Sequence, residues 1–263
     1  MKDIQNLEDN RNIDIQKVGV KNLNLPLTVQ KKNSTNQIVS ATARVSVSLP
    51  KHYKGTHMSR FVEVLTEWQH KNLLGIDIKG CLEKIIKKLN AKNGELEFKF
   101  TYYIDKKSPV KKMKAPMGYE CSFEGRITDG VYKFILGVIV PVTTLCPCSK
   151  EISNYGAHNQ RALINVKISY DESQQIWLED LIELIESCSS CPVYTLLKRE
   201  DEKFVTEKAW ENPKFVEDVL RDTVTKLRQN PIIKEFEVEC EAFESIHNHS
   251  AWAFQHEINT ATL

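Results

Sequence analysis

The stretch SATARVSVSLP, residues 40–50, contains the pattern on which the predicted fold depends. Small or apolar side chains alternate with polar ones from Ala41 to Leu49, and Pro50 ends the run. Because successive side chains of a strand point to opposite faces, this pattern predicts a strand with one buried face. One-sided burial is typical of an antiparallel sheet that carries its helices on a single face.

Around this strand, the first half of the chain predicts a simple order of elements. Apolar spacing of three and four residues indicates helices, and alternation or short apolar runs indicate strands. The expected elements are strands at 18–30 and 40–50, helices at 56–71 and 77–94, and strands at 95–104 and 118–127.

The second half predicts the same order without repeating the same residues. The expected elements are strands at 130–142 and 161–171, helices at 173–188 and 212–230, and strands at 235–243 and 250–258. For the second of these helices, Asn212 is the expected N-cap and Pro213 the expected first-turn residue.

The sequence therefore predicts an α+β protein with two tandem ββααββ modules, each an antiparallel sheet with helices on one face. The predicted divisions are a flexible N-terminus at 1–16, a first module at 17–128 and a second module at 129–263 that carries most site residues. A helix-free sheet face and open strand edges require cover, so the pattern also predicts an oligomer.

Composition restricts the function classes. The 263 residues contain 36 Lys and Arg against 35 Asp and Glu, which excludes a strongly basic nucleic-acid surface but not a local basic pocket. No segment reaches the roughly 18 apolar residues of a membrane helix, and the polar N-terminus has no apolar signal core, so we expect a cytoplasmic protein. The seven scattered cysteines are then expected as core residues, ligands or nucleophiles rather than disulfides.

The stretch TTLCPCSKEISNYGAHNQRAL, residues 143–163, holds the strongest candidates for chemistry. Pro147 favours an extended segment, on which Cys146 and Cys148 point the same way and do not close a disulfide. The pair is either structural or functional, with one thiolate on a metal and the other as nucleophile or acid/base. His158, just before the next strand, is either a third metal-site residue or an ordinary surface or core histidine.

Two further segments offer ligands, each with a plain structural alternative. The stretch at 197–213 offers four candidate carboxylates, and its alternative interpretation is a solvated charged loop: Glu200, Asp201, Glu202 and Glu207. The stretch at 244–256 contains His247 and His249, which share a face if extended and otherwise form a turn before the last strand.

Two other features each allow a functional and a structural interpretation. Glu217 lies on the expected helix at 212–230, where the alternative to a functional role is an i,i+4 ion pair with Arg221. Cys188 and Cys191 have metal or redox spacing but no matching second pair, so we interpret them as structural.

Several long sequence motifs, in order from about residue 16 to the end, together resemble those of one protein family. They are VGVKNLNLPL (18–27), ATARVSVSLPKHYKGTHMSRF (41–61), CPCSKEIS and YGAHNQR (146–161), LKREDEKFVTEKAWENPKFVEDVLRD (197–222) and HNHSAWA (247–253). The family is the prokaryotic type IB GTP cyclohydrolases.

The resemblance implies a fold, an assembly and a reaction. The fold is the tunnelling fold with two ββααββ modules, and the assembly is a homotetramer built as a dimer of dimers. The reaction converts GTP and water to 7,8-dihydroneopterin triphosphate and formate, the first step of tetrahydrofolate biosynthesis. It requires a divalent metal, with Zn²⁺, Mn²⁺ or Fe²⁺ as candidates, and no nucleic-acid or membrane partner.

The resemblance also assigns residues of the catalytic centre. Cys146 matches the family's metal-binding cysteine and Cys148 a cysteine needed for catalysis. His158 matches a metal ligand, and Glu202 rather than Glu200 aligns best with the carboxylate ligand.

For the substrate and proton transfer, the resemblance assigns His247 as a ligand or acid/base and Glu217 as the residue that holds the purine edge. Candidates for the triphosphate rest on charge and position alone: Lys54, His57, Arg60 and Arg161.

This assignment agrees with the chemistry of the reaction. A metal on Cys146, His158 and Glu202 would lower the pKa of bound water for attack on C8 of guanine. Cys148 and His247 would move protons, and Glu217 would accept hydrogen bonds from N1–H and the 2-amino group. The alternatives are another tunnelling-fold enzyme of purines or pterins, and a metal or redox sensor that uses the cysteines.

Overall fold

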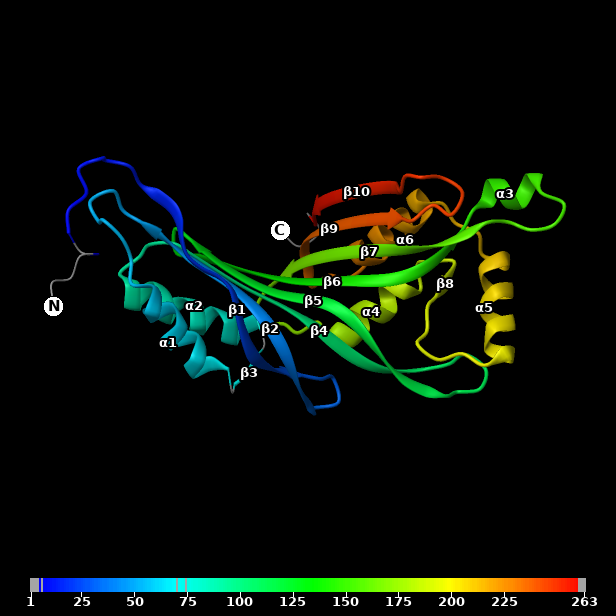
Figure 1. Cartoon of the computed structure of the whole chain (residues 1–263), viewed down its shortest axis with the longest axis horizontal. Helices are drawn as coiled ribbons and strands as arrows, with labels where there is room; N and C mark the ends of the chain where they lie inside the picture. Colours follow the sequence, from blue (N-terminus) through cyan, green and yellow to red (C-terminus); the bar gives the residue numbers. More distant parts are fainter. Residues whose placement is uncertain (1–4, 6, 70, 74, 260–263) are drawn as a thin grey trace. The chain divides into compact units, whose positions relative to one another are not determined.

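The computed structural model describes residues 5, 7–69, 71–73 and 75–259 (Figure 1). In chain order the elements are β1 (Ile15–Gln30), β2 (Asn36–Leu49), α1 (Met58–Trp68), β3 (Asn72–Leu73), α2 (Gly75–Leu89), β4 (Gly94–Lys107), β5 (Lys114–Thr128), β6 (Val131–Leu145), α3 (Pro147–Ile152), β7 (Asn159–Tyr170), α4 (Leu178–Glu186), β8 (Cys191–Pro192), α5 (Arg199–Glu211), α6 (Val216–Arg228), β9 (Ile233–Ala242) and β10 (Ala251–Ile258).

The strands form a sheet in the hydrogen-bonded order β10-β9-β7-β6-β5-β4-β2-β1-β3, with β8 on β6. The pairs β1–β2, β2–β4 and β9–β10 are antiparallel, and the two-residue β3 runs parallel to β1. The predicted α+β class is confirmed. None of the helices described is both long and apolar enough to cross a bilayer.

The chain divides into two compact units. Unit 1 comprises residues 1–101, 122–136 and 170–175, and unit 2 comprises 102–121, 137–169 and 176–263. This division cuts the long strands β4, β5 and β6, so it does not test the predicted module boundary between residues 128 and 129. Of the predicted flexible N-terminus, residues 1–4 and 6 lie outside the described residues, while Glu8 bridges Tyr53.

In unit 1, the alternating stretch from Ala41 to Leu49 forms part of β2 as predicted. Its apolar positions from Ala41 to Leu49 are buried, and α1 and α2 bring their apolar stripes to the same core. Phe61, Val64 and Leu65 of α1 are buried, as are the apolar residues Ile78, Leu82 and Ile85 of α2. The two helices lie side by side in Figure 1.

In unit 2, the helices α4 and α6 bury the stripes that their sequences predict. Leu181, Ile182 and Ile185 of α4 are buried, and so are Val219 and Leu227 of α6. They contribute to a core with the inward residues of β7 and β9, which alternate as expected. This core supports the strand ends from which the candidate site extends.

The expected cap of α6 is wrong. The helix begins at Val216, and the Asp218 carboxylate accepts a hydrogen bond from the Phe215 backbone N–H at 3.1 Å. Asn212 instead ends α5, and its side-chain amide donates to the carbonyl oxygens of Ser189 and Ser190 at 2.9 and 3.2 Å. An Asn-Pro pair therefore joins two helices here, because distant carbonyl groups compete for the asparagine.

Candidate active site

The Cys–His loop, residues 146–158, joins β6 to β7 in unit 2. Its two ends are tied together, because the Cys146 N–H donates to the His158 carbonyl oxygen at 3.1 Å. Pro147 starts the short helix α3, so the expected extended Cys-Pro-Cys segment is wrong. Proline is well suited to the first turn of a helix, where its missing N–H removes no hydrogen bond. Cys146 is the half-buried N-cap, and Cys148 lies exposed in the first turn.

Ser149 holds this loop closed through three hydrogen bonds. Its backbone N–H donates to Cys146 Sγ at 3.4 Å, and its hydroxyl donates to the Cys146 carbonyl oxygen at 3.2 Å. The His158 N–H donates to the same hydroxyl oxygen at 3.2 Å. The sulfur of Cys146 and the backbone of His158 are therefore fixed relative to each other.

The His158 ring lies close to two residues, Gln160 and Glu244, that were not predicted as site residues. Its Nδ1 lies 3.0 Å from Gln160 Oε1 and 3.9 Å from Glu244 Oε2. The side chains of His158 and Glu244 are only 15% and 14% exposed. Gln160 lies in the stretch HNQR and Glu244 begins the stretch ESIHNH. The two residues are 84 positions apart in the chain, so no sequence spacing predicts that they meet.

The predicted carboxylate ligand Glu202 lies on α5, where the charged stretch forms a helix and not a loop. Val205 and Ala209 of this helix pack with Leu145, which precedes the Cys–His loop, and with Ala157 near the end of that loop. Glu202 precedes Val205 by three residues and so shares its face of the helix, with an exposed side chain. Glu202 is therefore an exposed carboxylate on the helix that packs beside the Cys–His loop.

Glu200 and Glu207 have other partners. Glu200 Oε1 forms an ion pair with Lys111 Nζ at 2.7 Å. Glu207 Oε1 lies 3.7 Å from Lys203 Nζ on the helix surface. The Lys111 ammonium is the main cause of the lowered pKa of Glu200. These contacts favour Glu202 over Glu200 as the ligand candidate.

Asp201, the last of the four candidate carboxylates, is fully buried and has a structural role. Its Oδ1 accepts the N–H groups of Val110 and Lys111 at 2.8 and 2.9 Å, and its Oδ2 accepts that of Lys198 at 3.0 Å. Burial alone would raise the pKa of Asp201, but these backbone donors and the Ser108 hydroxyl outweigh it and lower the pKa to about 2. The carboxylate thus clamps the β4–β5 connection to the start of α5.

His247 lies in the exposed segment between β9 and β10. Its ring stacks on that of His249 with centroids 5.1 Å apart and an interplanar angle of 15°. The segment bends at residues 245–249 instead of being extended, so the condition for a shared strand face is not met, although the two rings stack. The Phe243 N–H donates to the Arg161 carbonyl oxygen at 2.9 Å, so this segment leaves the sheet beside the start of β7.

Glu217 is exposed in the first turn of α6. The alternative ion pair with Arg221 does not form, since Arg221 Nη1 lies 3.3 Å from Asp218 Oδ1 instead. The Lys214 N–H donates to the Leu145 carbonyl oxygen at 3.0 Å, which brings the start of α6 to the end of β6. Glu217 therefore belongs to the same end of unit 2 as the Cys–His loop.

The candidate phosphate-binding residues are distributed over both units. In unit 1, Lys54 and His57 precede α1 and Arg60 lies in its first turn. In unit 2, Arg161 is exposed on β7. Cys188 and Cys191 are buried and unpaired by disulfide, in agreement with a structural role.

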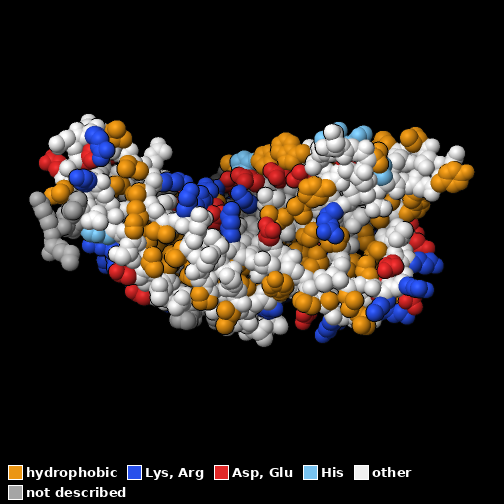
Figure 2. Space-filling model, viewed as in Figure 1, with side chains coloured by type: hydrophobic (Ala, Val, Ile, Leu, Met, Phe, Trp, Pro, Cys, Tyr) orange, Lys and Arg blue, Asp and Glu red, His pale blue; other side chains and the backbone are white. Residues whose placement is uncertain are grey.

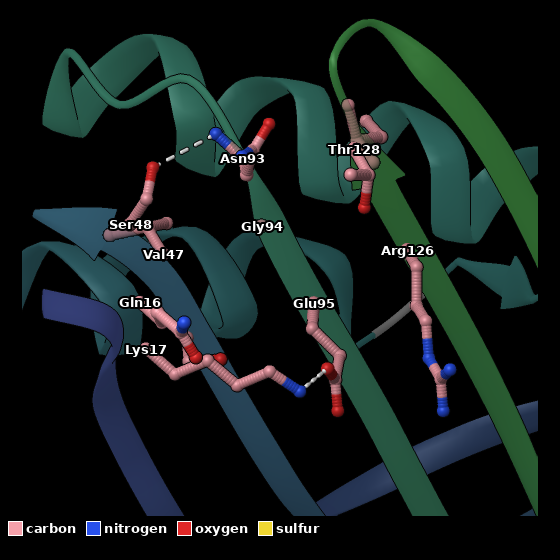
Figure 3. Close-up of a pocket in the computed structure, with 11 residues that line it drawn as sticks. Gln16, Lys17, Val47, Ser48, Asn93, Gly94, Glu95, Arg126 and Thr128 are labelled. Carbon is pink, nitrogen blue, oxygen red and sulfur yellow. Dashed lines mark hydrogen bonds and ion pairs between the residues drawn. The ribbon is translucent and has the colours of Figure 1, made fainter.

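Unit 1 also contains a pocket of about 280 Å³ that includes none of the predicted site residues (Figure 3). Lys17 bonds Glu95 within it, and the Asn93 N–H donates to Ser48 Oγ at 3.1 Å. Arg126 on its wall pairs with Glu124. Lys17 and Arg126 of the pocket are thus each paired with a carboxylate. On the visible face of the molecule, basic and acidic side chains are likewise interspersed (Figure 2).

The donor chemistry at the Cys–His loop suits a divalent transition metal. Sulfur, imidazole nitrogen and carboxylate oxygen are the ligand types that such ions prefer, and Cys146 and His158 are already held together. Among the residues that the structure describes, no three His, Cys, Asp or Glu side chains gather closely enough to form a complete site. Glu202 and His247 are the remaining candidates from the neighbouring segments.

Comparison with known proteins agrees with the resemblance. The family described as type I GTP cyclohydrolase folE2 matches residues 1–253. A GTP cyclohydrolase FolE2 of Geotalea uraniireducens is 51% identical over 253 residues, covering 96% of this chain and 92% of the relative. Another, of Thermosipho africanus, is 50% identical and covers 96% of both chains.

Solved structures share the fold at low sequence identity. The uricase of Arthrobacter globiformis matches with a TM-score of 0.54 and 6% identity, covering 93% of this chain and 94% of that one. The uricase of Bacillus fastidious matches with a TM-score of 0.53 and 11% identity, covering 94% and 95%. These likenesses support the uricase-like tunnelling fold, and the sequence matches establish that the chain belongs to the type I GTP cyclohydrolase FolE2 family.

Proposed function

We propose that this protein is a metal-dependent GTP cyclohydrolase that converts GTP and water to 7,8-dihydroneopterin triphosphate and formate. The observation that carries the proposal is identity of about one half over 96% of the chain to enzymes of that name. The joined ends of the Cys–His loop add support, because they hold a thiol and an imidazole at one site. The product is the starting pterin of tetrahydrofolate biosynthesis.

For the metal, Cys146 and His158 supply the first two donors, with Glu202 and His247 as the further ones. A divalent ion such as Zn²⁺, Mn²⁺ or Fe²⁺ held there supplies Lewis acidity, which makes water a better nucleophile near neutral pH. The closed loop supports this role, since Ser149 holds the Cys146 sulfur and the His158 backbone in place.

Proton transfer is the proposed task of Cys148 and His247. Both side chains are exposed at this end of unit 2, where a substrate can reach them. Ring opening at C8 requires a proton on the departing nitrogen, and the later ribose rearrangement and ring closure require further proton transfers. Cys146 joins the catalytic group through the metal.

Guanine recognition is assigned to Glu217. A carboxylate accepts two hydrogen bonds from the guanine N1–H and 2-amino group, which adenine does not offer. The position in the first turn of α6 leaves these oxygens exposed. Arg161, Lys54, His57 and Arg60 are the proposed partners of the triphosphate, whose negative charge needs cationic neighbours.

For the assembly, we propose two tandem ββααββ modules, at 17–128 and 129–263, in a cytoplasmic homotetramer built as a dimer of dimers. The order of the elements supports the modules, since β1, β2, α1, α2, β4 and β5 precede β6, β7, α4, α6, β9 and β10. The exposed Trp252, Phe254 and Ile258 on the strand β10 support an oligomer.

The direct test is incubation of the purified protein with GTP alone, with added Mn²⁺, and with a chelator. Formate and the fluorescence of the oxidised pterin are measured together, with ATP as the control substrate. Metal-dependent formation of both products from GTP is expected. Absence of formate both with and without added Mn²⁺ would refute the proposed reaction, and equal turnover with the chelator would refute the metal requirement.

A further inference from the structure

Gln160 occupies an unusual place on β7. The inward positions of this strand are apolar and buried at Ala162, Ile164 and Val166, and Gln160 is the next position of the same face toward the Cys–His loop. A half-buried amide therefore replaces an apolar residue where the core meets the candidate active site. Buried polar groups need hydrogen-bond partners, so the contacts of this amide carry information.

The amide has three partners from three segments of unit 2. Its Oε1 lies 3.0 Å from His158 Nδ1. Its Nε2 lies 3.2 Å from the Oγ1 of the buried Thr144 and 3.3 Å from Glu244 Oε1. One side chain thus connects the end of β6, the start of β7 and the segment after β9.

The partners determine which way the amide faces. An ionised carboxylate only accepts hydrogen bonds, so Glu244 requires the donor Nε2 on its side. Oε1 then faces His158, and because this oxygen only accepts, His158 Nδ1 must carry the proton. The carboxylate at 3.9 Å from Nδ1 is too distant for a direct hydrogen bond but favours a proton there.

We propose that Gln160 is a positioning residue that relays the carboxylate of Glu244 to His158 and fixes the Nδ1–H tautomer of that histidine, which leaves the Nε2 lone pair for the metal. This inference rests on the proposed function in taking His158 as a ligand. Partners of this kind, behind a ligating histidine, orient the ring and raise its basicity. Glutamine suits the position because a single side chain both accepts and donates at its tip.

The first test is a long-range ¹H–¹⁵N NMR spectrum of the ring nitrogens in the metal-free protein without substrate. His158→Gln identifies the signals of this ring. We expect the Nδ1–H tautomer in the unsubstituted protein and its loss in Gln160→Leu, which keeps a similar volume but has no hydrogen-bonding atoms. The Nε2–H tautomer in the unsubstituted protein, or an unchanged tautomer in Gln160→Leu, would overturn the proposal.

Two partner variants distinguish the relay from a general effect on packing. Thr144→Val removes the hydroxyl but leaves the carboxylate, so the amide stays oriented and the Nδ1–H tautomer is retained. Glu244→Gln lets the amide face either way, so the preference is lost. The opposite pattern would show that Thr144 and not Glu244 orients the amide, and would contradict the relay.

Metal titration supplies a second readout. Gln160→Leu should bind Mn²⁺ or Zn²⁺ about 10- to 100-fold more weakly than the unsubstituted protein. Lys167→Ala, on the exposed face of the same strand, is the matched control and should bind normally. Because the NMR experiment needs neither GTP nor metal, failure of the cyclohydrolase reaction and failure of the tautomer assignment are distinguishable. Equal metal affinity of Gln160→Leu would contradict the positioning role.

Discussion

The start of α5 and the Cys–His loop of unit 2 are both held by polar contacts, but they use their functional groups differently. At α5, both oxygens of the buried Asp201 are occupied by backbone N–H donors. At the loop, Ser149 and Gln160 fix Cys146 and His158, while Cys148 remains exposed. The first arrangement uses its polar atoms to stabilise the fold, and the second orients groups that remain available for chemistry.

This contrast explains how adjacent carboxylates have different roles. Asp201 and Glu202 are neighbours in sequence, yet on α5 the Asp201 side chain is buried and the Glu202 side chain is exposed. A carboxylate with every oxygen bonded to backbone is poorly suited to a metal, whereas an exposed one beside the loop is available. Substitutions in each region should therefore change different measurements.

The largest effect is expected from Cys148→Ala. Loss of a proton-transferring group should reduce kcat by about 10²- to 10⁴-fold. Metal content, measured by elemental analysis, should stay near that of the unsubstituted protein because Cys146 and His158 are unchanged. Loss of metal instead would mean that the roles of Cys146 and Cys148 are exchanged.

Glu202→Gln should weaken metal binding next most strongly, by about 100-fold, because a neutral amide replaces an anionic ligand. Titration of the metal-free protein with Mn²⁺ measures the change. Glu200→Gln is the matched control on the same helix, and it should leave the metal affinity unaltered since Glu200 pairs with Lys111. The reverse result would transfer the ligand role to Glu200.

Glu217→Gln should weaken GTP binding by about 10- to 100-fold while the metal is retained. The substitution replaces a charged carboxylate, which accepts two hydrogen bonds from guanine, by a neutral amide with a single acceptor oxygen. Calorimetry with a slowly reacting GTP analogue gives the dissociation constant. Asp218→Asn on the same turn controls for changes in the helix. Unchanged nucleotide affinity in Glu217→Gln would remove this residue from the guanine site.

Asp201→Asn should change stability and not metal affinity. The new amide donor opposes the backbone donor it faces, so Tm should fall by roughly 5 °C at neutral pH. Glu207→Gln, exposed on the same helix, should leave Tm unchanged. A Tm equal to that of the unsubstituted protein would contradict the proposed stabilising role of the Asp201 hydrogen bonds.

The pH dependence gives an independent check on the same clamp. Because the folded-state pKa of Asp201, about 2, is below the ordinary value of 3.8, its stabilisation is present above about pH 4 and is lost toward pH 2. The difference in Tm between the unsubstituted protein and Asp201→Asn should therefore shrink over this range.

Much of the architecture was predictable from the sequence because local patterns reflect burial. The alternation of β2 and the apolar stripes of α1, α2, α4 and α6 lie where they were expected. The wrong expectations concern α3, which starts at Pro147, and Asn212, which bonds to Ser189 and Ser190. Local propensity allowed two outcomes at each place, and contacts with distant residues selected one.

The sequence by itself determined the element order, the family and the candidate residues, because hydrophobic periodicity and long sequence motifs are local properties of the chain. Only the tertiary structure decided that Asp201 is structural, through residues about 90 positions away, and that Gln160 joins His158 to Glu244. Hydrogen-bond partners of a buried group are set by folding, which brings together segments that no sequence spacing connects.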